Sequence, residues 1–186
     1  MSGNPRYVRG MSKTAARSQR LAAAPLSAIG FAIAVAAAAT LAGAWFFELF
    51  IGLEPCPLCL DQRVPYYAAI PLGIVIGLLA LDPERTRIAR VGFALLGLIL
   101  LTGAAYGVYH AGVEWGFWQG PAACAGGAPV RTDDILSTLK GTQRVVSCSD
   151  AAWRFLGISL AGYNVLIAGA LSLVAFAAAS GRIGRA

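Results

Sequence analysis

The 19 residues from Val91 to Tyr109 read VGFALLGLILLTGAAYGVY and contain no charged side chain. An α-helix that crosses a bilayer needs about 20 mostly apolar residues, so this stretch predicts a membrane span. Three further charge-free segments have the same character, at residues 21–47, 64–81 and 155–181. One such segment alone would also suit a buried core helix, but four of them in 186 residues leave too little polar chain to cover them in water. We therefore expect an all-α membrane protein built as a four-transmembrane-helix bundle.

The composition excludes an ordinary water-soluble domain. The chain is 58% hydrophobic and 13% charged, whereas soluble domains are roughly 45–50% apolar and about 25% charged. Its length suits one transmembrane domain at residues 21–181, between a basic tail at 1–20 and a short tail at 182–186. The first apolar segment is longer than the core of a secretory signal, about 7 to 15 residues, so we expect it to be retained as a span.

The positive charges predict the orientation of the chain. Four spans place both termini on one side of the membrane, and ten of the 15 lysines and arginines lie in the two tails and the 82–90 loop. The positive-inside rule then makes the termini cytoplasmic and the loops at 48–63 and 110–154 periplasmic. The net charge of +6 is explained as an orientation signal with a weak attraction to the lipid bilayer, so no nucleic-acid partner is expected.

All four cysteines lie in the two loops assigned to the outside. Cys56 and Cys59 form a C-x-x-C pair in the first loop, and Cys124 and Cys148 lie in the second. In an oxidising compartment such cysteines form disulfides or exchange them. For the second pair, a structural staple of the long loop and a redox pair are equally good interpretations. A zinc site would want a second closely spaced pair, which the chain lacks, so no metal is expected.

Pro57 predicts where a helix begins within the C-x-x-C pair. Proline suits the first helical position, which would make Cys56 the N-cap and put Cys59 in the first turn. There the helix dipole stabilises a thiolate. Pro65 and Pro71 follow closely and are expected to kink the span or delay its regular start.

A dithiol that turns over needs an acceptor for two electrons. The sequence has no G-x-G-x-x-G fingerprint, no C-x-x-C-H haem signature and no iron–sulfur pattern. A lipophilic quinone dissolved in the membrane is the acceptor that remains. Arg63 lies four residues after Cys59 and could stabilise a thiolate or an anion there, although an arginine at this depth also suits a lipid headgroup. Tyr66 and Tyr67 likewise suit an ordinary interfacial belt.

Three features together resemble a known family: the stretch PCPLCLDQR at 55–63, the stretch YHAGVEW at 109–115, and the late pair Cys124 and Cys148. They are similar to the disulfide bond formation protein B (DsbB) family of bacterial inner-membrane thiol oxidases. The resemblance covers roughly residues 21–181. It implies an enzyme, a protein-disulfide:quinone oxidoreductase that sustains disulfide bond formation from the bacterial inner membrane.

The resemblance also implies a role for each cysteine. Cys124 would be attacked by a reduced DsbA-like periplasmic protein of the thioredoxin fold. Cys148 would pass the electrons to Cys56 through an interloop disulfide. Cys59 would then be the thiolate that faces the quinone, which is ubiquinone or menaquinone from the membrane pool.

Two further residues match quinone-binding positions of the family. These are Arg63 and His110, the only histidine in the chain; taken alone, His110 would also suit a satisfied interfacial histidine. Residues 132–140 predict a short amphipathic helix in the second loop. Two alternatives to the thiol oxidase are a quinone reductase like vitamin K epoxide reductase, which usually carries its C-x-x-C near the last span, and a non-catalytic scaffold whose loop is stapled by a disulfide.

Overall fold

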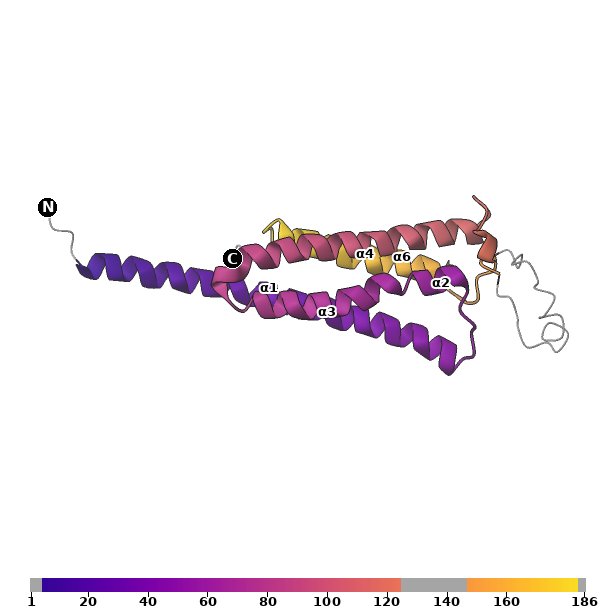
Figure 1. Cartoon of the computed structure of the whole chain (residues 1–186), viewed down its shortest axis with the longest axis horizontal. Coiled ribbons are helices and arrows are strands. Elements are labelled where there is room, and N and C mark those ends of the chain that lie inside the picture. Colours follow the sequence, from indigo (N-terminus) through magenta and orange to yellow (C-terminus); the bar gives the residue numbers. More distant parts are fainter. Residues whose placement is uncertain (1–4, 125–146, 184–186) are drawn as a thin grey trace.

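Four long helices run side by side along one axis (Figure 1). The structure is a computed structural model that describes residues 5–124 and 147–183. The long helices are α1 (Pro5–Leu49), α3 (Val64–Leu79), α4 (Thr86–Glu114) and α6 (Leu160–Ala179). The short elements are α2 (Pro57–Asp61), η1 (Pro83–Arg85), η2 (Ala122–Cys124), β1 (Arg154–Phe155) and β2 (Ile158–Ser159).

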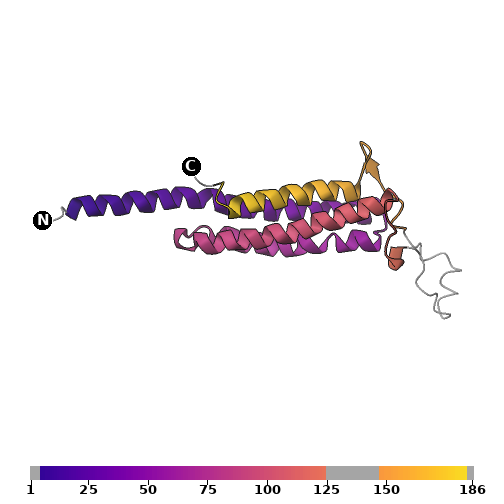
Figure 2. The same cartoon turned by 90° about the horizontal axis from the view of Figure 1, so that it is seen from above.

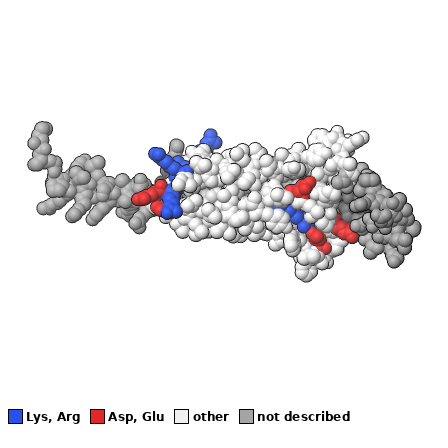
Figure 3. Space-filling view, in the orientation of Figure 1, with Lys and Arg blue, Asp and Glu red and all other residues white. Residues whose placement is uncertain are grey.

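Four helical segments are long and apolar enough to cross a membrane. They are Pro25–Leu49, Pro57–Leu79, Pro83–Glu114 and Leu160–Ala179. On the face drawn in Figure 3, a broad belt without charged side chains separates the charged groups near the two ends of the bundle. The expectation of an all-α protein with four spans is therefore confirmed, with one two-stranded hairpin added to it.

Three helices have bounds that the charge-free segments did not predict. Helix α1 begins at Pro5, within the stretch expected to be a basic tail. Helix α4 continues past Tyr109 to Glu114, so His110 lies within it and not after it. Helix α6 begins only at Leu160, because residues 154–159 form an antiparallel hairpin. The turn of this hairpin has positive φ at Leu156 (50°) and Gly157 (81°), a backbone conformation that a right-handed α-helix does not contain.

The helices pack in the order α1, α3, α4, α6, and α1 makes few contacts with α6. Figure 2 shows α6 lying beside α4, which is the longer of the two helices. Helices α1 and α3 meet at glycines: a Cβ atom on Gly30 would lie 2.8 Å from Cα of Gly77 and 2.9 Å from the carbonyl oxygen of Gly73. Small residues let transmembrane backbones approach this closely, which maximises van der Waals contact where no hydrophobic force acts.

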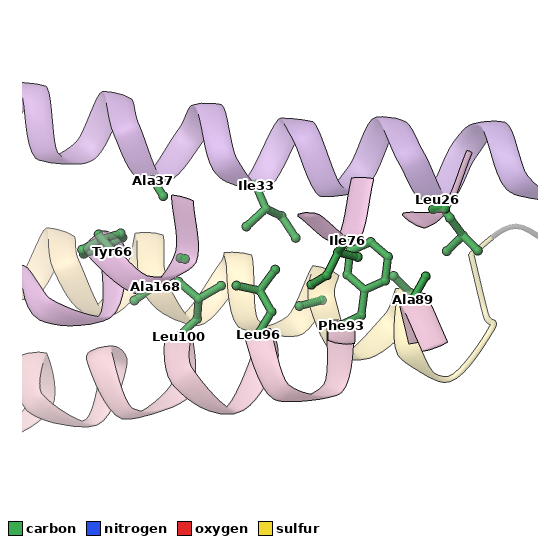
Figure 4. Packing of buried hydrophobic residues seen from close by; sticks show 14 of the residues in the cluster. Leu26, Ile33, Ala37, Tyr66, Ile76, Ala89, Phe93, Leu96, Leu100 and Ala168 are labelled. Atoms are coloured by element: carbon green, nitrogen blue, oxygen red, sulfur yellow. The ribbon is translucent and has the colours of Figure 1, made fainter. Parts of the chain in front are cut away.

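The core fills the space between the four helices (Figure 4). Its largest fully buried side chains are Phe93, Leu96 and Leu100 of α4, with Leu26 and Ile33 of α1 and Ile76 of α3. This core holds the helices in fixed register, so the loops at each end are held in fixed relation too.

Both cysteine loops lie at the same end of the bundle. In Figure 1, α2 and the segment around η2 are at one end, and the last turn of α6 is at the other, together with the loop from α3 to α4. Successive long helices run in opposite directions, so the first and third connections between them lie at the same end. The amphipathic helix expected at 132–140 falls outside the described residues.

Candidate redox site

The C-x-x-C pair sits at the start of α2, as Pro57 predicts. Cys56 is the N-cap, with extended backbone (φ −71°, ψ 163°), and Pro57 is the first helical residue. The Sγ atom of Cys56 accepts a hydrogen bond from the backbone N–H of Cys59 at 3.3 Å. The two sulfur atoms lie 2.7 Å apart. The cap therefore holds both sulfurs on one turn of backbone.

The second cysteine pair packs directly against the first. Cys124 and Cys148 form a disulfide, and both are buried. The Sγ atoms of Cys148 and Cys56 lie within 4.8 Å of one another. Leu58 and Val113 complete this small apolar cluster. Four sulfur atoms from two loops thus form one contiguous group.

His110 joins this group from α4. Its Nε2 atom lies 3.6 Å from Sγ of Cys56, and its Nδ1 atom lies 2.6 Å from Nε2 of Gln62. The same amide nitrogen of Gln62 donates to the carbonyl oxygen of Leu58 at 3.2 Å, which identifies it as the donor. Nδ1 therefore accepts from Gln62, and the ring proton sits on Nε2, the atom nearest Cys56.

These contacts favour the thiolate of Cys56. The hydrogen bond from the Cys59 thiol and the nearby His110 lower the pKa of Cys56 to about 5, against the opposing effect of burial. A thiolate is the form that attacks disulfides. Gln62, which the sequence reasoning did not single out, contributes through its contact with His110. Nothing in the sequence shows that these two residues meet.

A helix break separates Arg63 from Cys59, so the continuous helix that the spacing argument assumed is not formed. Helix α2 ends at Asp61, and Arg63 is the N-cap of α3. Pro65, the second residue of α3, explains the break, since proline lacks the N–H that a continuous helix needs. Nη1 of Arg63 instead forms an ion pair with Oε2 of Glu48, at 2.6 Å.

A cavity of about 610 Å³ adjoins both sulfurs of the C-x-x-C pair. It lies at the end of the bundle that carries the cysteines and is lined by residues of α1, α3, α4 and α6. Most of its walls are apolar. The titratable or amide side chains that line it are Glu54, Gln62, Arg63, Tyr66, His110, Glu114, Asp150, Tyr163 and Asn164, together with Cys56 and Cys59. Apolar cavities of about 300–1,000 Å³ with a few polar groups are typical small-molecule sites.

The donor groups in this cavity suit a quinone. A quinone ring is apolar with two carbonyl oxygens, and the cavity offers the guanidinium of Arg63 and the Nε2–H of His110 as donors. The structure brings both predicted quinone-binding residues to the same cavity as Cys59. On the far wall the Tyr66 hydroxyl donates to Oδ1 of Asn164 at 2.6 Å, and the Asn164 amide donates to the carbonyl oxygen of Gly103 at 3.1 Å, so α3, α4 and α6 are joined there.

Glu114, like Gln62, is a residue of the site that the sequence reasoning did not single out. It appeared there only inside the stretch 109–115. Its side chain is 4% exposed, and its Oε1 atom lies 3.9 Å from Nε2 of His110. The i to i+4 spacing on α4 brings the two together.

Comparison with known proteins identifies the family. The family model described as Disulfide bond formation protein DsbB matches residues 27–178. A protein of Marinobacter nauticus named Disulfide bond formation protein B is 34% identical over 139 residues, which are 69% of this chain and 77% of that protein. Proteins of the same name from Azoarcus and Xanthomonas oryzae are 34% and 32% identical, over 74% and 77% of this chain and 82% and 84% of those proteins. No solved structure matches significantly. The chain therefore belongs to the DsbB family of disulfide bond formation membrane proteins.

Proposed function

We propose that this protein is a thiol oxidase that reoxidises a periplasmic DsbA-like dithiol protein and passes the electrons to membrane quinone. The observation that carries the proposal is the contiguous group of four sulfurs beside an apolar cavity in the membrane bundle. A disulfide-forming oxidoreductase needs an entry point for electrons from a protein partner and an exit to an acceptor. The second cysteine pair serves as the entry and the C-x-x-C pair as the exit.

The first step is disulfide exchange with the partner. A thiolate of the reduced partner attacks Sγ of Cys124, which breaks the Cys124–Cys148 bond and forms an intermolecular mixed disulfide. The second thiol of the partner then attacks that mixed disulfide. The partner leaves oxidised, and Cys124 and Cys148 are left as a dithiol, so two electrons have moved onto this chain.

The second step moves these electrons to the C-x-x-C pair. The Cys148 thiolate attacks Cys56 of a Cys56–Cys59 disulfide, which gives an interloop disulfide and frees the Cys59 thiolate. Attack by Cys124 on Cys148 then restores the second pair and leaves Cys56 and Cys59 reduced. The distance of less than 4.8 Å between Sγ of Cys56 and Cys148 supports this step, because little movement is needed for bond formation.

The last step oxidises the C-x-x-C pair back to a disulfide. Quinone, when bound, supplies the acceptor for two electrons and two protons. Arg63 and His110 would hold its oxygens, and the apolar wall would exclude water from the site. The hydrogen bonds that favour the Cys56 thiolate also lower the cost of removing its proton before the disulfide reforms.

The proposed location is the bacterial inner membrane, with both termini cytoplasmic and all four cysteines periplasmic. The distribution of lysine and arginine between the two ends supports this orientation. It matches the redox chemistry, because stable disulfides and thiol exchange belong to the oxidising side of the membrane.

The test is oxidation of a reduced DsbA-like protein by the purified chain with added ubiquinone or menaquinone. Wild type should oxidise the partner catalytically, and Cys59→Ser should stop quinone reduction. Ser180→Ala, at the opposite end of the bundle, should behave as wild type. Continued quinone-dependent turnover by Cys59→Ser would refute the electron path. A wild-type protein that exchanges no thiol with the partner would instead be a stapled scaffold.

A further inference from the structure

The carboxyl group of Glu114 is buried in the redox site. Its side chain is only 4% exposed, and Oε2 is buried without a hydrogen-bond partner among the described residues. Leaving a buried acceptor unpaired costs about 1–3 kcal/mol, and more for a charged group. Nothing in the packing of α4 requires an acid at this position, since the neighbouring Val113 belongs to the same apolar cluster as the cysteines. The cost indicates a functional role.

Glu114 is connected to the sulfurs through one ring. Sγ of Cys56 lies 3.6 Å from Nε2 of His110, and the same Nε2 lies 3.9 Å from Oε1 of Glu114. Glu114 also lines the cavity that adjoins the C-x-x-C pair. A carboxyl group that reaches both a histidine beside a thiol and an apolar cavity is placed to move a proton between them.

We propose that Glu114 is the proton carrier that takes the proton leaving Cys56 and releases it into the cavity. This inference rests on the proposed function. In the reduced pair Cys56 is a thiolate, Cys59 keeps its thiol proton, and Glu114 holds the proton that Cys56 gave up. When the Cys56–Cys59 bond forms, two electrons leave the sulfurs, and the protons of Cys59 and Glu114 accompany them to the two oxygens of the quinone-class acceptor. The proton on Nε2 of His110 stays in place and faces the Cys56 thiolate. Cys59 itself lines the cavity and gives up its proton there without a carrier.

The other charged groups around the cavity are less well placed for this task. Arg63 is held in an ion pair with Glu48 and remains a cation. Glu54 and Asp150 also line the cavity, but both are exposed to solvent and neither has a described contact with His110 or Cys56. Glu114 is the described acid within 4 Å of the histidine that contacts Cys56.

The test measures thiol exchange with the partner and quinone reduction separately in Glu114→Gln. This variant keeps the shape of the side chain but carries no acidic proton. Exchange between the reduced partner and the protein, measured in a single turnover without quinone, should match wild type. Reduction of added ubiquinone should be slower by about 10²-fold, the lower end of typical proton-transfer effects. Glu114→Asp should recover part of the rate, since it restores the carboxyl. Glu84→Gln, in the loop at the other end of the bundle, is the matched control.

A second readout needs no quinone. Infrared difference spectra between the disulfide and dithiol forms of the quinone-free protein should contain a carboxylic acid carbonyl band that shifts in heavy water and is missing in Glu114→Gln. Quinone reduction by Glu114→Gln at the wild-type rate, or an unchanged infrared difference spectrum, would overturn the role of Glu114. Failure of the proposed function would look different, because wild type itself would then not reduce quinone.

Discussion

Replacing Gln62 with leucine should raise the pKa of Cys56, although the two side chains do not touch. The amide of Gln62 donates to Nδ1 of His110 at 2.6 Å and so keeps the ring proton on Nε2, 3.6 Å from Sγ of Cys56. Leucine has a similar volume but no donor. Nδ1 would then be free to carry the ring proton, and Nε2 would no longer donate toward the thiolate.

The expected change in the pKa of Cys56 follows from the hydrogen bond that is lost. A hydrogen bond to a charged group contributes about 1.5–3 kcal/mol, and a pKa change of one corresponds to about 1.36 kcal/mol. The pKa of Cys56 should therefore rise by about 1 to 2, from about 5 in the wild type. It should stay well below the ordinary value of 9.0, because the hydrogen bond from the Cys59 thiol, the largest cause of the lowered pKa, remains in place.

The pKa can be measured by thiolate ultraviolet absorbance in a reduced Cys124→Ser, Cys148→Ser background. There Cys56 and Cys59 are the only thiols. Thiolate should form near pH 5 without the Gln62 substitution and near pH 6 to 7 with it, so the two proteins differ most between these values. Gln119→Leu makes the same chemical change at an exposed position and should leave the titration unchanged. An unaltered midpoint in Gln62→Leu would refute the tautomer argument, and a midpoint near 9.0 would show that His110, and not Cys59, dominates.

Two further predictions concern the frame around the site. Glu48→Gln removes the charged partner of Arg63 from a partly buried ion pair. The free energy of unfolding should fall by about 1 kcal/mol, a loss between those of typical exposed and buried pairs. The thermal midpoint in detergent should therefore be lower than that of wild type, and the difference should shrink in high salt. Gly30→Val must move α1 away from α3, because its Cβ would lie 2.8 Å from Cα of Gly77. The free energy of unfolding should fall by about 1–3 kcal/mol, measured in the same thermal melt. Gly43→Val, where a Cβ meets nothing within 4 Å, should lose much less, and equal losses would contradict the close approach.

Much of the fold could be predicted because each span is a local property of the sequence. Twenty or so residues without charge identify a span wherever it packs, and the N-cap role of Cys56 follows from Pro57 alone. The prediction failed where local signals conflict. Residues 155–159 are apolar and extend the last segment, yet the turn at Leu156 and Gly157 makes them a hairpin before α6.

The parts of the site that the sequence could not predict depend on contacts between distant elements. Gln62 and His110 are 48 positions apart, and only the packing of α4 against the start of α3 brings them together. The ion pair of Arg63 likewise joins it to Glu48, a residue 15 positions earlier that belongs to α1. The pairing of cysteines was also open, since four cysteines allow three pairings.

The central claim is that the two cysteine pairs exchange disulfides, and trapping the exchange tests it most directly. A Cys59→Ser, Cys124→Ser variant keeps only Cys56 and Cys148, whose sulfurs lie within 4.8 Å of one another in the wild-type structure. After mild oxidation in the membrane and alkylation, mass mapping should recover the peptides of Cys56 and Cys148 joined by a disulfide within one chain. Recovery of both cysteines separately alkylated would contradict the relay.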